Sequence, residues 1–141
     1  MTVDDYESAI MDGVSAQNLN KPEKAIKHFE RAIEIDPERA GGYLGRANSL
    51  NTLGKYRDAI EDYDRALGID PSLANAYANR GIAYANLGEN EKAIADYEKA
   101  LELDPKIDDA PSFVKRLFDN VPNKEKGIRK HLEALKQQQK S

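Results

Sequence analysis

The sequence contains no cysteine and no hydrophobic run long enough to cross a membrane. Without cysteine there are no disulfide bonds, no thiolate metal ligands and no thiol nucleophiles. A membrane-spanning helix needs about 20 consecutive apolar residues, and no segment approaches that length. The first residues, MTVDDYESAIMDG, are acidic and lack the basic and apolar regions of a secretory signal. We therefore expect a cytoplasmic protein with no membrane insertion.

Groups of residues that could perform catalysis are also missing. The two histidines, His28 and His131, have no metal-ligand spacing around them, and no glycine-rich phosphate loop occurs. Carboxylates are numerous, but they lie among arginines at helical spacings typical of a solvated helix face: Asp58, Glu61, Asp62 and Asp64 beside Arg57 and Arg65. We therefore expect a protein that is not an enzyme, with no catalytic residues, no cofactor and no metal ion.

Charge is spread unevenly along the chain. The formal net charge is −4, of which residues 123–141 contribute +4 and the remainder −8. General nucleic-acid binding needs a basic face along the fold, so the acidic body argues against it. Contact of the basic segment alone with acidic lipid or nucleic acid stays an alternative that rests only on this charge.

A repeat of 34 residues runs through the chain. Asp-Pro pairs end at Pro37, Pro71 and Pro105, and the match extends through units that begin at Tyr6, Ala40 and Ala74. Each unit has leucine at position 14, alanine at 20, isoleucine at 21, an aromatic residue at 24 and alanine at 27. A fixed period of this length indicates a repeat architecture.

Each unit is expected to form a helical hairpin. In EKAIADYEKALEL the apolar residues recur at spacings of three and four, which places them in one stripe on a helix. Asn20, Gly54 and Gly88 stand between the two helices, where a left-handed backbone is needed. The Asp-Pro pair ends the second helix, because proline disfavours helical geometry in the residue before it.

Small residues are expected to bring the two helices of a hairpin close together. Position 8 is Gly13, Ala47 or Gly81, and the aromatic residue at position 24 fills the remaining space. The small residues at positions 8, 20 and 27, the aromatic residues at 4, 11 and 24, and the proline at 32 resemble the tetratricopeptide repeat, most fully in the third unit. The first unit has Ala9 and Ala16, and the second has Leu50, where aromatic residues are usual. This resemblance covers residues 6–105. It implies an all-α fold, a right-handed superhelix (solenoid) of antiparallel helix-turn-helix hairpins.

A fourth, divergent hairpin is predicted after the third unit. GIRKHLEAL lines up with AIADYEKAL, which keeps Ile128, Ala134 and Leu135 in frame, whereas His131 replaces the aromatic residue and Pro111 replaces a tyrosine. We predict a short helix that begins near residue 111 and a final helix over about 123–138. The domain prediction is one array over 1–141, with repeats 6–39, 40–73 and 74–107 and a divergent capping hairpin at 108–139.

The resemblance implies a concave groove lined by the first helix of each unit. Asparagine is dense at the groove positions, and a carboxamide both donates and accepts hydrogen bonds, so it can bind an extended peptide backbone. Asn48 and Asn79 match asparagines that hold peptide backbone in some family members. The alternative is that these asparagines are ordinary polar surface residues. The predicted groove residues are Asn48, Asn51, Asn75, Asn79, Ile82, Asn86, Phe113 and Arg116.

The function implied is a non-catalytic adaptor that binds an extended peptide or a helix of another protein. The alternative is a self-assembling element, a homo-oligomer formed through the groove or through an end that carries Phe113, Leu117 and Phe118. Family members that bind the acidic tails of heat-shock chaperones use lysine and arginine in a carboxylate clamp. The corresponding positions hold no cation in either frame: Ile10, Val14, Gly45, Asn75 and Asn79, or Leu44, Asn48, Asn79, Asp109 and Phe113. No carboxylate clamp is expected.

Overall fold

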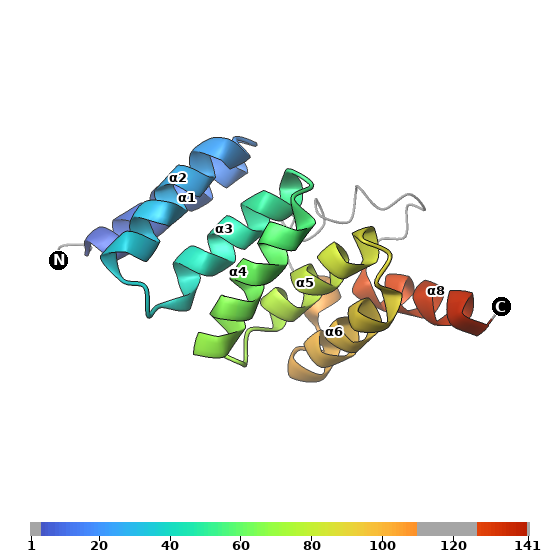
Figure 1. Ribbon diagram of the computed structural model, residues 1–141. Coiled ribbons are helices and arrows are strands. Elements are labelled where there is room, and N and C mark those ends of the chain that lie inside the picture. Colours follow the sequence, from blue (N-terminus) through green and yellow to red (C-terminus); the bar gives the residue numbers. More distant parts are fainter. Residues whose placement is uncertain (1–3, 110–126, 141) are drawn as a thin grey trace. The chain divides into compact units, whose positions relative to one another are not determined.

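The computed structural model describes residues 4–109 and 127–140 (Figure 1). These residues form helices and contain no strand. In chain order the elements are α1 (Asp5–Asn18), α2 (Pro22–Ile35), α3 (Ala40–Thr52), α4 (Tyr56–Ile69), α5 (Ala74–Asn86), α6 (Asn90–Leu103), the short 3-10 helix η1 (Ile107–Asp109) and α8 (Ile128–Lys140).

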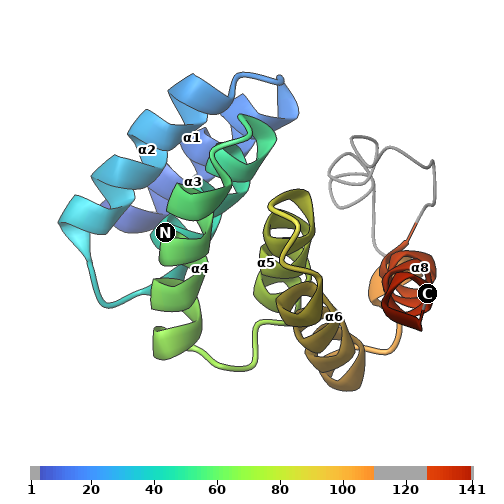
Figure 2. The same cartoon turned by 45° about the vertical axis from the view of Figure 1, so that its right-hand side comes forward.

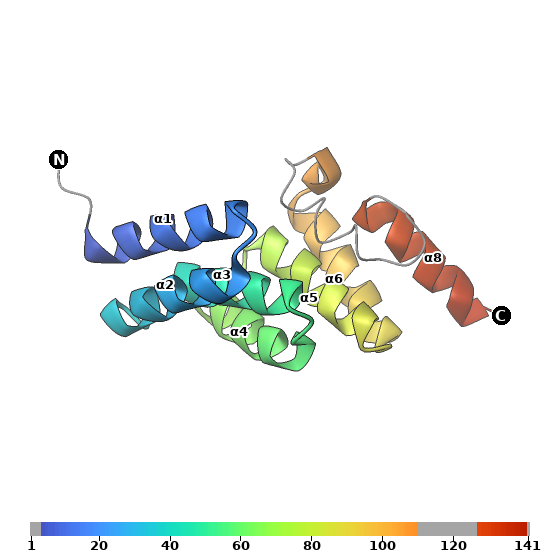
Figure 3. The same cartoon turned by 90° about the horizontal axis from the view of Figure 1, so that it is seen from above.

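The chain divides into two compact units, Met1–Pro71 and Ser72–Ser141. In the first unit α1 packs on α2, α3 packs on α4, and α3 also lies against α2 and α1 (Figure 3). In the second unit α5 packs on α6, and α8 packs beside α6, seen nearly end-on in Figure 2. The helices pair as the 34-residue period predicts, while the boundaries of the repeats stay a prediction.

The turns between the paired helices have the backbone that the sequence predicts. Asn20, Gly54 and Gly88 have φ angles of 59°, 77° and 78°, in the left-handed region. After α1 the amide of Lys21 donates to the carbonyl of Ala16 (2.9 Å), which closes the helix end. Asn20 adopts this conformation because asparagine tolerates it better than other residues with a side chain.

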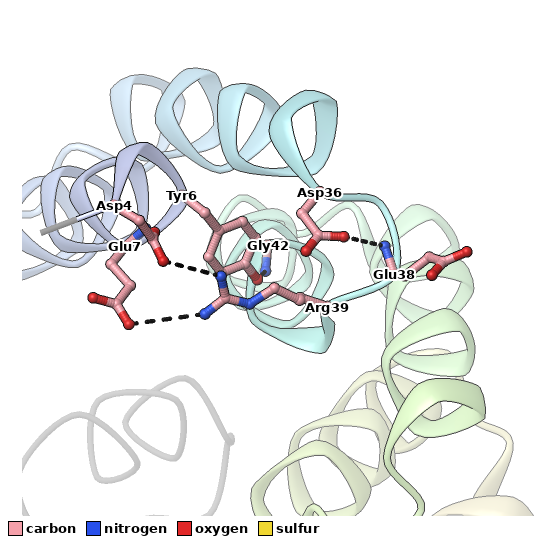
Figure 4. Close-up of polar contacts among 7 residues, drawn as sticks. All are labelled: Asp4, Tyr6, Glu7, Asp36, Glu38, Arg39 and Gly42. Atoms are coloured by element: carbon pink, nitrogen blue, oxygen red, sulfur yellow. Dashed lines mark hydrogen bonds and ion pairs between the residues drawn. The ribbon is translucent and has the colours of Figure 1, made fainter.

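The Asp-Pro pairs end α2, α4 and α6. Asp36, Asp70 and Asp104 have extended φ angles of −148°, −135° and −143°, and the helices stop at the residues before them. The Asp36 carboxylate then accepts a hydrogen bond from the amide of Glu38 (3.1 Å), which turns the chain toward α3 (Figure 4). The predicted helix ends are confirmed.

Glycines let the helices of the first unit close around one aromatic ring. Phe29 of α2 is almost completely buried. A Cβ atom added at Gly13 would lie 2.6 Å from Cε1 of this ring, and Gly45 of α3 abuts the same ring atoms. In the second unit a Cβ at Gly81 would lie 2.7 Å from Cε1 of Tyr97. The predicted close approach at position 8 is confirmed, whereas the second contact at Gly45 was not predicted.

Gly13→Ala is expected to lower the free energy of unfolding by about 1 kcal/mol. Overpacking lowers the free energy of unfolding by roughly 1–3 kcal/mol, and the better helix propensity of alanine raises it by about 1 kcal/mol. Gly68→Ala in α4 is the matched control, because a Cβ there meets nothing within 4 Å. It is expected to raise the free energy of unfolding by about 0.5–1 kcal/mol. Urea denaturation followed by circular dichroism measures both; the same sign for the two variants contradicts the packing argument.

Helix α8 keeps the predicted frame. Ile128, Leu132 and Leu135 are buried against a core that includes Tyr97 and Ile107. His131 takes the place of the aromatic residue of position 24. Its Nδ1 lies 2.8 Å from the Tyr97 hydroxyl, and the two rings lie 5.2 Å apart.

The start of α8 differs from the prediction. Gly127 has a φ of 112°, so the final helix begins at Ile128 rather than near 123, and it extends to Lys140. The cause is a cap from outside the helix: the Asp108 carboxylate accepts from the amide of Ile128 (2.8 Å) and, more weakly, from that of Arg129 (3.4 Å). The predicted short helix near 111, with Phe113 and Arg116, lies outside the described residues.

Candidate functional site

The asparagines of α3 are buried and serve the first unit itself. Asn48 and Asn51 are 7% and 4% exposed. The Tyr63 hydroxyl of α4 donates to Oδ1 of Asn48 at 2.5 Å. Burial raises the pKa of Tyr63 well above its usual value, and a hydrogen bond with Asn51 opposes this rise. Tyr63 therefore stays a protonated donor, and both carboxamides are used to satisfy a buried hydroxyl.

The predicted groove residues of α5 divide into two buried and two exposed. Asn79 and Ile82 are 0% and 2% exposed. Asn75 and Asn86 are exposed, and Asn86 donates to the carbonyl of Ile82 at 2.9 Å. These four residues follow one another at helical spacing, so they lie in one stripe along α5. Solvent reaches the two ends of that stripe.

A sequence signal for the role of Asn48 was available and was missed. Where position 24 is Phe29, position 9 is Val14; where position 24 is Tyr63, position 9 is Asn48. A buried hydroxyl needs a partner, and a buried phenylalanine does not. In the next hairpin position 9 is Ile82, and the Tyr97 hydroxyl meets His131 instead. Burial raises the pKa of Tyr97 as well, so this hydroxyl also keeps its proton.

Helix α1 carries the corresponding positions of the first hairpin and differs in chemistry. Gln17 donates from Nε2 to the carbonyl of Gly45 (3.1 Å) and to the hydroxyl of Ser49 (3.0 Å), which fixes α1 on α3. Met11 and Val14 are 60% and 42% exposed. This face is therefore apolar where α3 and α5 carry asparagine.

Acidic residues surround the start of α1 (Figure 4). The Arg39 guanidinium lies 3.9 Å from the centre of the Tyr6 ring, and its nitrogens lie 3.5 Å from Asp4 and 3.9 Å from Glu7. The Tyr6 hydroxyl accepts from the amide of Gly42 at 3.0 Å. These contacts tie α1 to the start of α3.

A partly buried ion pair joins the two helices of the second hairpin, and an equivalent pair joins the two helices of the third. Arg46 binds Asp62 through two hydrogen bonds of 2.7 and 2.9 Å, and Arg80 binds Asp96 through two of 2.8 Å. The hydrogen bond with Asp62 raises the pKa of Arg46. The placement of Asp62 on a solvated face is wrong, because Asp62 is only 5% exposed. A helical charge pattern cannot reveal that an arginine of the preceding helix turns one carboxylate inward.

Residues 4–109 and 127–140 offer no cluster of three or more histidine or acidic side chains that could hold a metal ion. Over the same ranges no helix has the length and apolar character needed to cross a bilayer. The described helices present both polar and apolar side chains to solvent, such as Asn75 and Asn86 on α5 and Met11 and Val14 on α1. Such a surface is suited to binding.

Two family models match the chain. The tetratricopeptide repeat model matches residues 12–39 and 74–107, and a further model of this repeat matches residues 47–88. The chain belongs to the tetratricopeptide repeat family. Membership confirms the resemblance and the fold class, an all-α solenoid fold of helical hairpins.

Solved structures of tetratricopeptide repeat domains resemble this one. The second such domain of Spaghetti (RPAP3), bound to the HSP90 peptide SRMEEVD, is 31% identical, with a TM-score of 0.68 over 70% of this chain and 92% of that one. The first domain of the same protein, bound to the same peptide, is 24% identical, with a TM-score of 0.78 over 96% and 94%. The TPR2B domain of yeast Sti1 in complex with pHsp70 is 26% identical, with a TM-score of 0.69 over 82% and 94%. No curated protein matches this tetratricopeptide repeat chain.

Proposed function

We propose that the protein is a non-catalytic interaction module that binds a peptide or a helix of a partner protein through the first helices of its hairpins. The observation that carries this proposal is the 31% identical tetratricopeptide repeat domain with a peptide bound. The chemistry of the described helices agrees with it, since they offer hydrogen-bonding and apolar side chains. A cytoplasmic location is part of the same proposal.

The exposed carboxamides of α5 support peptide binding in the second unit. Asn75 and Asn86 are eleven residues apart, which is about three turns, so they lie on one side of the helix. Each can donate to and accept from the backbone of an extended segment. Asn48, Asn51 and Asn79 are buried, so direct contact with a ligand is not assigned to them.

The proposed ligand is not an acidic chaperone tail. Counted from the first unit, the positions that hold lysine and arginine in a carboxylate clamp carry Ile10, Asn75 and Asn79 here. Without cations the terminal carboxylates of such a peptide would lose their water without gaining charge-assisted hydrogen bonds. Micromolar binding of the peptide SRMEEVD would overturn this part of the proposal.

Replacing both Asn75 and Asn86 with alanine is expected to weaken partner binding about tenfold, since two hydrogen bonds are each worth roughly 0.5–1.5 kcal/mol. The partner is first identified by affinity purification of the native complex and mass spectrometry, and its affinity is then measured by calorimetry. Asn90→Ala on α6 is the matched control, because it removes a carboxamide from a second helix of a hairpin. Equal affinity for all variants, with unchanged circular dichroism, contradicts the assignment of this face.

Self-association is the competing proposal. It rests on Phe113, Leu117 and Phe118, which lie outside the described residues. Light scattering of the purified protein separates the two functions. A monomer at high micromolar concentration rules out assembly and leaves the interaction module.

A further inference from the structure

Helix α1 has an exposed apolar surface at positions that are buried in the other hairpins. Met11 and Val14 are three residues apart, so they are neighbours on the helix. They are 60% and 42% exposed. The residues at the same two positions are buried in the other hairpins. They are Gly45 and Asn48 in α3, and Asn79 and Ile82 in α5. Large apolar side chains thus face solvent where the fold elsewhere covers the residue.

The electrostatic surroundings of this surface are acidic. Residues 4–20 contain four carboxylates, Asp4, Asp5, Glu7 and Asp12, and no lysine or arginine. Three of them meet an arginine of another helix only at 3.5–3.9 Å, and their side chains remain 52–56% exposed. Exposed pairs at this distance are weak and leave the carboxylates available to an incoming cation.

A second copy of the chain offers no matching surface among the residues that the structure describes. The basic helix α8 contains none of the exposed large apolar side chains. Apart from Met11, Val14 and Leu19, the exposed large apolar residues are Ile35, Ile69 and Leu103. Each of these three is followed directly by an aspartate. An apolar side chain next to an acidic one does not complement an apolar surface with an acidic border. Charge complementarity points to a basic partner protein, and binding of a second copy is kept as an outcome of the test.

We propose that the segment bound by the first unit is basic and apolar: it packs one or more aliphatic or aromatic side chains on Met11 and Val14 and places lysine or arginine near Glu7, which lies four residues before Met11 on the same side of α1. This inference rests on the proposed interaction function and specifies its ligand. It separates the protein from the peptide-bound relatives, whose peptide SRMEEVD is acidic. Oppositely charged partners also associate faster at low salt, so binding weakens as ionic strength rises.

A phage-displayed library of random peptides, panned against the full chain, tests this. The enriched peptides are expected to combine leucine, isoleucine, methionine or phenylalanine with lysine or arginine. A synthetic peptide of the enriched sequence is then measured by fluorescence anisotropy. Met11→Glu is expected to weaken its binding at least about tenfold, as truncating an anchor contact does. Ile35→Glu is the matched control, since Ile35 is 44% exposed and lies at the end of α2. This variant is expected to bind the peptide with the affinity of the unaltered chain.

The outcomes separate this inference from the function on which it rests. Enrichment of acidic peptides, or of peptides that bind the Met11→Glu variant as tightly as the unaltered chain, overturns the inference and leaves a peptide-binding module. If the library yields no enriched peptide, both this inference and the proposed interaction function are contradicted. Sedimentation velocity adds one more outcome: a dimer that Met11→Glu converts to a monomer shows that the surface binds a second copy, and the inference fails. Circular dichroism of both variants confirms that they are folded.

Discussion

Asp96→Ala is expected to lower the free energy of unfolding by about 3–5 kcal/mol, the usual result of removing one partner of a buried ion pair. The Asp96 side chain is 8% exposed and that of Arg80 is 19% exposed, and two hydrogen bonds of 2.8 Å join them. The guanidinium also lies between the rings of Tyr77 and Tyr84, at 5.5 and 5.9 Å from their centres. It cannot turn to water without leaving these contacts. Urea denaturation measures the loss.

The equivalent pair of the preceding hairpin gives a graded control. Arg46 is 28% exposed, so after Asp62→Ala it can be hydrated more easily, and a smaller loss is expected. The double variant Arg80→Met with Asp96→Leu is expected to recover most of the stability, because no buried charge is left without its partner. Equal losses for Asp62→Ala and Asp96→Ala, or no recovery in the double variant, would show that burial of the arginine does not set the effect.

The repeat made the helices and turns predictable because their causes are local. A left-handed residue must end the first helix of a hairpin, and only a few residue types adopt that conformation easily. Asn20, Gly54 and Gly88 could therefore be placed from the sequence. The Asp-Pro pairs act in the same way, through the backbone of the residue before the proline.

Contacts between different helices were not predictable, because the two partners of each contact are far apart in the sequence. Gly45 is small since it meets Phe29 of the preceding hairpin. Asp108 fixes the first residue of α8 from twenty residues away. Asp62 is turned inward by Arg46 of the helix before it. Neither periodicity nor propensity contains this information, because each describes one helix at a time.

The prediction of the binding residues was limited in the same way, because burial depends on neighbouring helices. The sequence placed the asparagines of α3 and α5 on the helix stripe named for the groove, but it could not tell which of them reach solvent. Asn75 and Asn86 do, while Asn48 and Asn79 are buried. The buried asparagines match the peptide-holding positions of the family, and in the first unit Asn48 is already engaged by Tyr63.

Asn48→Ala is accordingly expected to act on stability before it acts on binding. It leaves the Tyr63 hydroxyl buried with one hydrogen bond fewer, which costs about 1–3 kcal/mol, and we expect a value near 2. A direct role in binding alone would instead leave the urea midpoint unchanged and reduce only the affinity for the partner. Thermal and urea unfolding, measured beside partner affinity, distinguish the two.

The first hairpin supplies the compensating variant. It pairs Phe29 with Val14 where the second pairs Tyr63 with Asn48. Asn48→Val combined with Tyr63→Phe removes donor and acceptor together, so its loss is expected to be smaller than the sum of the two single losses by about 1 kcal/mol. Recovery is incomplete because Asn51 also hydrogen-bonds Tyr63. Strictly additive losses would show that the hydrogen bond does not couple these residues, and Asn48 would then return to the group of ligand-binding candidates.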